Sequence, residues 1–450
     1  MTEPRTSALT KRVLDEYATV RDALPAGVIS PERRHEAIQM LVARGLPTTR
    51  DENWRYTNLR PLERARFAPI AAAAAGPALP SSADVPARLE GFARYAFVDG
   101  VFAPELSAPV GAPVTVSSRR HGVQRAAGTA TVTHLPHSLP ALSSLPEARL
   151  ALLNEAFATD IATIHVSDPS GEPARVELVF IATAGADAGA SYPRTRVSLD
   201  PATRLALVER HIGLAGSASF INAAVDLDIG RGAHLTHYRL QQAGLRALWL
   251  DTLAAVLAAE ARYDLLTVST GALSARSTTY VQMAGAGAEL TLSAAALGDR
   301  QQVQDNFALV EHVAPRARTE QTFRGIASGR ARVAFNGKIA VRETAAGTDS
   351  RQSLRGLLAG PEAEIDVRPQ LEIYTDDVRC SHGATAGKLD DNMLFYLLSR
   401  GLSPEVAQRL LKWAFLEDVV SKIALPELRR QIELQLAGQM ADAASLKELL

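Results

Sequence analysis

The chain has 450 residues, of which 47% are hydrophobic and 22% charged, which is typical of a soluble globular protein with a large core in two or three domains. Its formal net charge is −1, so no overall field would draw it to nucleic acid or to an anionic membrane. The single cysteine excludes an internal disulfide bond and any all-cysteine zinc or iron–sulfur centre held by this chain alone. No signal-peptide core follows the first residues and no run reaches roughly 18 apolar residues, so we expect a cytoplasmic protein without a membrane span.

Residues 1–65 are predicted to form an N-terminal helical domain. Leu14, Tyr17 and Val20 recur at helical spacing, which is typical of one buried helix face. A second helix is expected to end at Gly45-Leu46-Pro47, because glycine and proline terminate helices.

Residues 66–159 form a variable segment, rich in alanine and proline, that leads into the core. Its clearest pattern is a β-hairpin in which Asp99-Gly100 joins two short runs of apolar and aromatic residues. A short helix is expected from Glu147 to Phe157.

Residues 160–388 are predicted to form a β-rich core, because short strands with alternating apolar residues follow one another. A weak four-residue signature recurs. It consists of a turn residue, an alanine, a polar residue and an apolar or β-prone residue, in that order. These alanines are separated by 28, 27, 29, 14 and 32 residues and are Ala233, Ala261, Ala288, Ala317, Ala331 and Ala363. Such self-similarity favours the stacked coils of a β-solenoid. A large antiparallel sandwich is the alternative on pattern alone.

Residues 389–450 are predicted to form a C-terminal helical domain. Asp390 or Asp391 can cap a first helix, Ser403 can cap a second, and Pro426 starts a third. Helices at both ends would cover the open coils of a solenoid and would also offer docking faces.

Cys380 and His382 are the candidate metal ligands. If the chain is extended from Asp376 to His382, alternate side chains share a face, and Cys380 and His382 lie about 7 Å apart on one surface. A thiolate and an imidazole in this relation form half of a transition-metal site. A closed tetrahedral site needs four ligands, so the others would come from elsewhere in the fold or from another chain.

Other catalytic motifs are missing from the sequence. It contains no phosphate-binding loop of the form G-x-x-x-x-G-K-[ST] and no H-E-x-x-H, C-x-x-C or G-x-S-x-G. A β-helix enzyme acting on carbohydrate is one alternative function, although Asp376 and Asp377 would face opposite sides of a strand and aromatic residues make up only 5% of the chain. A self-contained metal enzyme is another alternative.

The stretch around this pair resembles the C-terminal signature of the SufD family, subunits of the SUF iron–sulfur cluster assembly system. The similarity rests on Asp376-Asp377-Val378-Arg379-Cys380-Ser381-His382-Gly383-Ala384-Thr385 and continues through Leu394-Phe395-Tyr396-Leu397-Leu398-Ser399-Arg400-Gly401. Upstream pieces include Phe335-Asn336-Gly337-Lys338-Ile339 and Glu52-Asn53-Trp54-Arg55-Tyr56-Thr57. The paralogous SufB carries His-Glu-Ala where this chain has His382-Gly383-Ala384, so the resemblance favours SufD.

The resemblance implies a mainly β fold, with a right-handed parallel β-helix between N- and C-terminal helical regions. It implies a non-catalytic scaffold subunit that pairs with SufB through the β-helix and docks the ABC-type ATPase SufC on its C-terminal helices. SufC would supply ATP hydrolysis.

The resemblance then implies that His382 is a candidate ligand for the nascent cluster at the SufB–SufD interface. Cys380 matches the family cysteine two positions earlier, whereas the cysteine ligand of that site comes from SufB. A histidine that only forms hydrogen bonds at the interface is the alternative for His382.

The family implies that this chain alone holds no stable cofactor and that iron or a cluster is shared transiently with SufB. Reduced flavin is a candidate cofactor of the complex, and a homodimer is a candidate assembly of the chain alone.

Overall fold

The computed structural model describes residues 7–57, 59–70, 79–109, 114–118, 122–125, 149–169 and 171–440. Parts of the variable segment predicted over 66–159 lie outside these residues, as do Glu147 and the final ten positions of the region predicted to be helical from residue 389.

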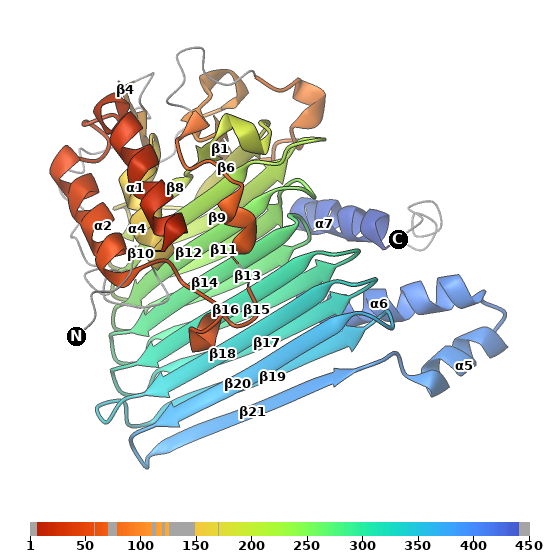
Figure 1. Cartoon of the computed structure of the whole chain (residues 1–450). Helices are drawn as coiled ribbons and strands as arrows, with labels where there is room; N and C mark the ends of the chain where they lie inside the picture. Colours follow the sequence, from red (N-terminus) through yellow and green to blue (C-terminus); the bar gives the residue numbers. More distant parts are fainter. Residues whose placement is uncertain are drawn as a thin grey trace.

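The core is a parallel β-solenoid built from two facing sheets (Figure 1). From β8 to β21 consecutive strands alternate between the sheets, and each pairs in parallel with a strand two positions away in strand order. Antiparallel pairing between the described strands is confined to β1–β2, β3–β4 and β3–β5. The predicted solenoid is therefore confirmed, and the antiparallel sandwich is not the fold.

Sheet I runs in the order β2 (Val101–Phe102), β1 (Ala93–Val98), β6 (Ala174–Ala182), β9 (Arg204–Gly213), β11 (His234–Gln242), β13 (Arg262–Ser269), β15 (Glu289–Gly298), β17 (Arg318–Ala327), β19 (Thr348–Leu358) and β21 (Val378–Gly387). Sheet II runs in the order β20 (Glu364–Ile373), β18 (Arg332–Val341), β16 (Val303–His312), β14 (Ser274–Met283), β12 (Leu248–Leu257), β10 (Phe220–Ile229), β8 (Arg194–Leu199), β5 (Ile161–Val166), β3 (Val114–Ser118) and β4 (Gly122–Arg125), and β7 (Ala190–Ser191) also pairs with β10.

The recurring alanines lie at the turns that enter the strands. Ala233, Ala261, Ala288 and Ala317 precede strands of sheet I and are fully buried, because only a small side chain fits inside the turn. Ala331 is equally buried but precedes β18 of sheet II. The interval of 14 residues in the sequence repeat is therefore half a coil.

The C-terminal helices α5 (Asp391–Ser399), α6 (Pro404–Val420) and α7 (Pro426–Gln439) follow the last strand. Helices α6 and α7 cover the outer face of sheet I, where Trp413, Leu416 and Leu428 share a buried cluster with strand residues such as Leu240. Ser403 caps α6 and Asp390 caps α5, as the sequence predicts.

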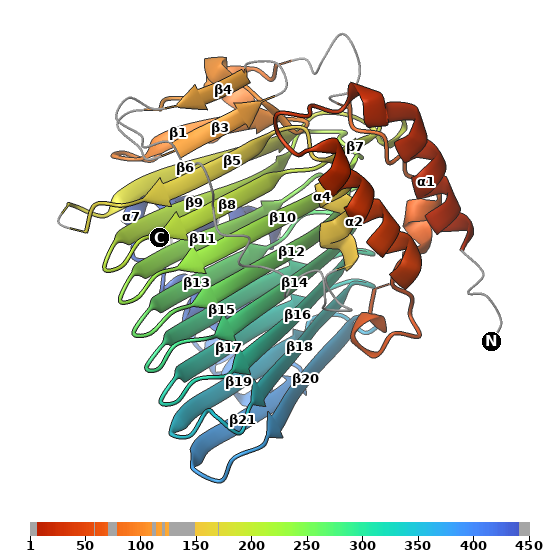
Figure 2. The same cartoon turned by 90° about the vertical axis from the view of Figure 1, so that its left-hand side faces the viewer.

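The N-terminal helices α1 (Ala8–Val20) and α2 (Pro31–Arg44) pack with α4 (Arg149–Phe157) beside sheet II (Figure 2). Trp54 belongs to the same buried cluster as Phe220 and Leu250 from that sheet. Within the described part of the chain, no helix is both long enough and apolar enough to span a membrane.

Candidate metal site at the open end of the solenoid

The solenoid ends at β20 and β21, which we call the open end (Figure 1). Among the described strands, β20 pairs only with β18 and β21 only with β19, so each has one edge without a strand partner. Side chains of β20 are mostly half-buried and those of β21 mostly exposed, in contrast to the buried strands inside the stack. An unpaired, exposed strand edge is a template for pairing with another chain.

Large apolar side chains are exposed close to the open end in sequence. Tyr374 follows β20 and is 53% exposed, and Met393, Phe395 and Tyr396 on α5 are 60%, 71% and 55% exposed. Figure 1 shows α5 extending beyond the stack rather than covering it. Exposed apolar patches mark interaction sites in soluble proteins, and these side chains are candidates for such a site.

Cys380 and His382 both lie on β21, two positions apart, so they share a face as the sequence predicts. That face is the inner one, because Cys380 packs against the hydrophobic core of the solenoid. The strand begins at Val378. Asp376 and Asp377 therefore precede it, and the extended segment is shorter than the sequence pattern predicts.

The strand register gives each of the two residues a polar neighbour on β19. Cys380 is opposite Ser350, and His382 is opposite Gln352. Ser350 and Gln352 are buried, whereas Cys380 is half-buried and His382 is exposed. The last rung of the inner face therefore carries the candidate ligands, and the rung behind it carries buried hydrogen-bonding groups.

The environment of Cys380 favours the neutral thiol. Burial raises the pKa of Cys380 above its ordinary value, and the Asp349 carboxylate raises it further, while the backbone N–H of Ser350 acts in the opposite direction. A neutral thiol is a poor metal ligand, because the thiolate is the species that binds metal.

In the described part of this chain, Cys380 and His382 do not belong to a larger group of possible metal ligands. Across the part of the chain that the structure describes, no group of three or more His, Cys, Asp or Glu side chains could hold a metal ion. A tetrahedral metal centre has four ligands. Any such centre that uses Cys380 and His382 therefore needs two further ligands besides this pair.

A buried ionic network deeper in the solenoid is not predicted by the sequence analysis. Arg239 bridges the carboxylates of Glu209 and Asp251, with donor–acceptor distances from 2.6 to 3.3 Å. Burial alone would raise the pKa of Glu209, but the Arg239 guanidinium and hydrogen bonds from His211 and His237 outweigh burial and place this pKa well below its ordinary range. The network is therefore a paired set of buried charges.

The sequence does contain a pattern that could have indicated this buried network. Glu209 and His211 on β9, and His237 and Arg239 on β11, are polar residues two positions apart, on the same faces as the inward Leu207 and Leu235. The alternation shows that they share a face, but only the parallel register brings Glu209 opposite Arg239.

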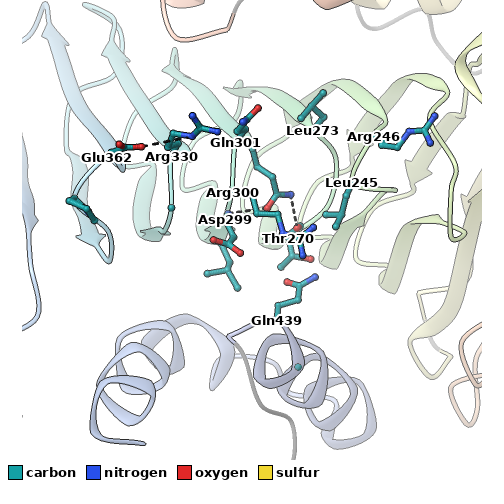
Figure 3. Close-up of a pocket in the computed structure, with 15 residues that line it drawn as sticks. Leu245, Arg246, Thr270, Leu273, Asp299, Arg300, Gln301, Arg330, Glu362 and Gln439 are labelled. Carbon is teal, nitrogen blue, oxygen red and sulfur yellow. Dashed lines mark hydrogen bonds and ion pairs between the residues drawn. The ribbon is translucent and has the colours of Figure 1, made fainter. Parts of the chain in front are cut away.

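A groove with a volume of about 810 Å³ lies between the solenoid turns and the end of α7 (Figure 3). Of its two carboxylates, Glu362 pairs with Arg330 at 3.9 Å and Asp299 interacts with the Lys412 ammonium. No aromatic side chain is among the described residues that line it. Cleavage of a glycosidic bond uses two carboxyl groups, one as acid and one as base or nucleophile. Both carboxylates of this groove interact with cations, so the lining does not favour a carbohydrate-cleaving site.

Comparison with known proteins identifies related chains. A family model described as "SUF system FeS cluster assembly, SufBD core domain" matches residues 180–415, from β6 into α6. The chain is 29% identical over 422 residues to "Iron-sulfur cluster assembly protein SufD" of Escherichia coli (strain K12), covering 92% of this chain and 94% of that protein. It is 26% identical over 412 residues to "Iron-sulfur cluster assembly SufBD family protein slr0076" of Synechocystis, covering 89% of each. The matched region includes the open end and both candidate ligands.

Proposed function

Because the chain belongs to the SufBD family of SUF-system FeS cluster assembly proteins, we propose that it is a scaffold subunit that contributes one part of a cluster-assembly site at its open end. The observation that carries this proposal is the position of Cys380 and His382 on the inner face of β21, beside unpaired strand edges. Iron and the nascent cluster are cargo in this proposal, and they leave the site once assembled.

The partner at the open end is the paralogous subunit SufB. A second β-helix could continue the stack, because the unpaired edges of β20 and β21 offer backbone N–H and C=O groups for pairing. The inner-face ligands of both subunits would then meet at the junction. SufB would supply the ligands that Cys380 and His382 lack.

His382 is the principal ligand from this chain. As a neutral imidazole it presents one nitrogen lone pair, a suitable donor to iron. Cys380 is secondary, because it packs against the core and its thiol is held neutral.

The ATPase SufC binds the C-terminal helices and drives the motion that exposes the junction. Support comes from α5, whose large apolar side chains are exposed and which extends beyond the stack (Figure 1). The sequence has no phosphate-binding loop of its own, so the proposal assigns nucleotide binding to this partner.

The test is His382→Ala in a complex co-expressed with SufB and SufC. We expect a complex of unchanged mass by light scattering, and roughly tenfold slower cluster formation from iron and sulfide, followed by visible absorption. His35→Ala is the matched control, because His35 is an exposed histidine on α2, far along the chain from the open end. The control should form clusters at the wild-type rate.

Two outcomes would overturn the ligand role. In the first, the His382→Ala complex forms clusters at the wild-type rate. In the second, the complex no longer assembles, which would make His382 an interface residue instead.

A further inference from the structure

Three inward-facing residues form a column that ends at the open end. Gln321 on β17 is opposite Gln352 on β19, and Gln352 is opposite His382 on β21. Neighbouring strands lie about 4.8 Å apart, so each side chain in the column is within reach of the next. We call Gln321, Gln352 and His382 the His382 column.

The amide nitrogen of Gln352 is committed to the interior of the solenoid. It donates to Gln321 Oε1 at 2.7 Å and to the backbone oxygen of Gly337 on β18 at 3.0 Å. An amide has two N–H donors, so both are used. Nothing remains on this nitrogen for His382.

Gly337 is the residue that allows this arrangement. A Cβ atom at this position would lie 2.9 Å from Gln321 Oε1 and 3.0 Å from Gln352 Nε2. Any larger residue would displace the two amides, so the backbone of β18 approaches them only because position 337 is glycine.

The amide oxygen of Gln352 has no hydrogen-bond partner among the described residues, although the side chain is only 4% exposed. A buried acceptor without a partner is energetically unfavourable. Because the nitrogen is bonded toward β17 and β18, the oxygen is left for the side of β21. The residue opposite on β21 is His382.

We propose that Gln352 is a positioning residue for His382, in which Gln352 Oε1 accepts a hydrogen bond from one imidazole N–H. This bond selects one tautomer of the neutral ring and fixes its orientation. The other ring nitrogen then carries the lone pair and is available at the open end. Its use as an iron ligand rests on the function proposed above, whereas the hydrogen bond is proposed for the isolated chain and does not depend on that function.

The direct test is NMR of the isolated chain with ¹⁵N- and ¹³C-labelled histidine. The His382 signals are assigned by their loss in His382→Ala. In the wild-type chain we expect ring shifts of one dominant tautomer and slowed exchange of its N–H with water. Ring shifts of the tautomer mixture found for a water-exposed histidine would overturn the proposal, and this measurement needs no variant at position 352.

Gln352→Met removes the acceptor and keeps the length of the side chain. We expect the His382 ring to revert to the mixture of a water-exposed imidazole, with fast N–H exchange. Gln304→Met is the matched control, because Gln304 is also a buried, hydrogen-bonded amide and lies on β16, away from the open end. Gln304→Met should leave the His382 signals unchanged. If Gln352→Met also leaves them unchanged, the proposal is wrong.

A second readout separates this proposal from the proposed function. In the complex with SufB and SufC, Gln352→Met should slow cluster formation about tenfold without changing the mass of the complex. If His382→Ala forms clusters normally, the proposed function fails, while the NMR result still decides the Gln352–His382 hydrogen bond. If His382→Ala is slow but Gln352→Met forms clusters at the rate of Gln304→Met, the positioning role fails and the ligand role stands.

Discussion

The guanidinium of Arg276 donates a hydrogen bond to the carboxylate of Asp305 at 2.6 Å, and both side chains are fully buried. The pair lies under the N-terminal region, because the Trp54 ring is 4.6 Å from the Arg276 guanidinium and the Thr57 hydroxyl donates to Asp305. Residues more than two hundred positions apart are thereby joined, and the N-terminal region is attached to sheet II by a paired charge rather than by apolar contact alone.

Arg276→Met should destabilise the chain strongly. The substitution leaves the Asp305 carboxylate buried without its cation, a loss that typically costs about 3–5 kcal/mol of unfolding free energy. Urea denaturation of the isolated chain measures this cost.

The double variant Arg276→Met with Asp305→Asn should recover part of that loss, since no charge is then left buried. Arg231→Met is the control, because Arg231 and Glu260 form a pair whose side chains are 70% and 66% exposed. Its unfolding free energy should stay close to that of the wild type. If the losses of unfolding free energy in Arg276→Met and Asp305→Asn simply add in the double variant, the two side chains are not energetically coupled and the prediction is wrong.

The stability of the chain should fall as the pH decreases from about 6.5 to about 4, in part because of His312. Burial lowers the pKa of His312 to about 4, from an ordinary value of 6.5. As the pH falls, the unfolded chain therefore takes up this proton first, which favours unfolding until the folded chain also protonates near pH 4. The penalty from this one group reaches roughly 3 kcal/mol.

His312→Met should flatten this dependence, as measured by urea midpoints across that pH range. The substitution also removes the hydrogen bond between His312 and Thr319, a loss that lowers stability at every pH. The exposed His35→Met variant should keep the wild-type slope. An unchanged slope in His312→Met would show that other groups carry the acid sensitivity.

Cys380→Ser should impair cluster formation less than His382→Ala does. Cys380 packs against the core and is half-buried, whereas His382 is exposed at the open end. The measurement is the rate of cluster formation in complexes with SufB and SufC, under the conditions used for His382→Ala. A loss with Cys380→Ser equal to or greater than that with His382→Ala would make the cysteine the principal ligand.

Phe395→Glu should weaken binding of SufC without altering the melting temperature of the isolated chain. Phe395 on α5 is 71% exposed, so the substitution removes no internal contact of consequence but adds a charge to a proposed docking face. Co-purification of SufC with the chain measures the effect. Leu79→Glu is the control, because Leu79 is also an exposed apolar residue, 50% exposed, and precedes β1. Equal retention of SufC by both variants would argue against docking on α5.

Several features of this protein follow from sequence alone because they depend on near neighbours. The Asp99-Gly100 turn joins β1 to β2 as predicted, since both residues adopt positive φ angles of 48° and 84°. The caps at Ser403 and Asp390 are equally local. Strand alternation likewise determines that Cys380 and His382 share a face.

The partners of these residues were decided only by the tertiary structure. Gln352 is thirty positions before His382, and they become neighbours because one coil of the solenoid returns the chain to the same column. Apart from the half-coil interval of 14, the repeat intervals vary between 27 and 32 residues, so the sequence indicates stacked coils without specifying which residues come into register. A shift of one residue would turn the opposite face inward, and the buried contacts that select the register are those of the packed core.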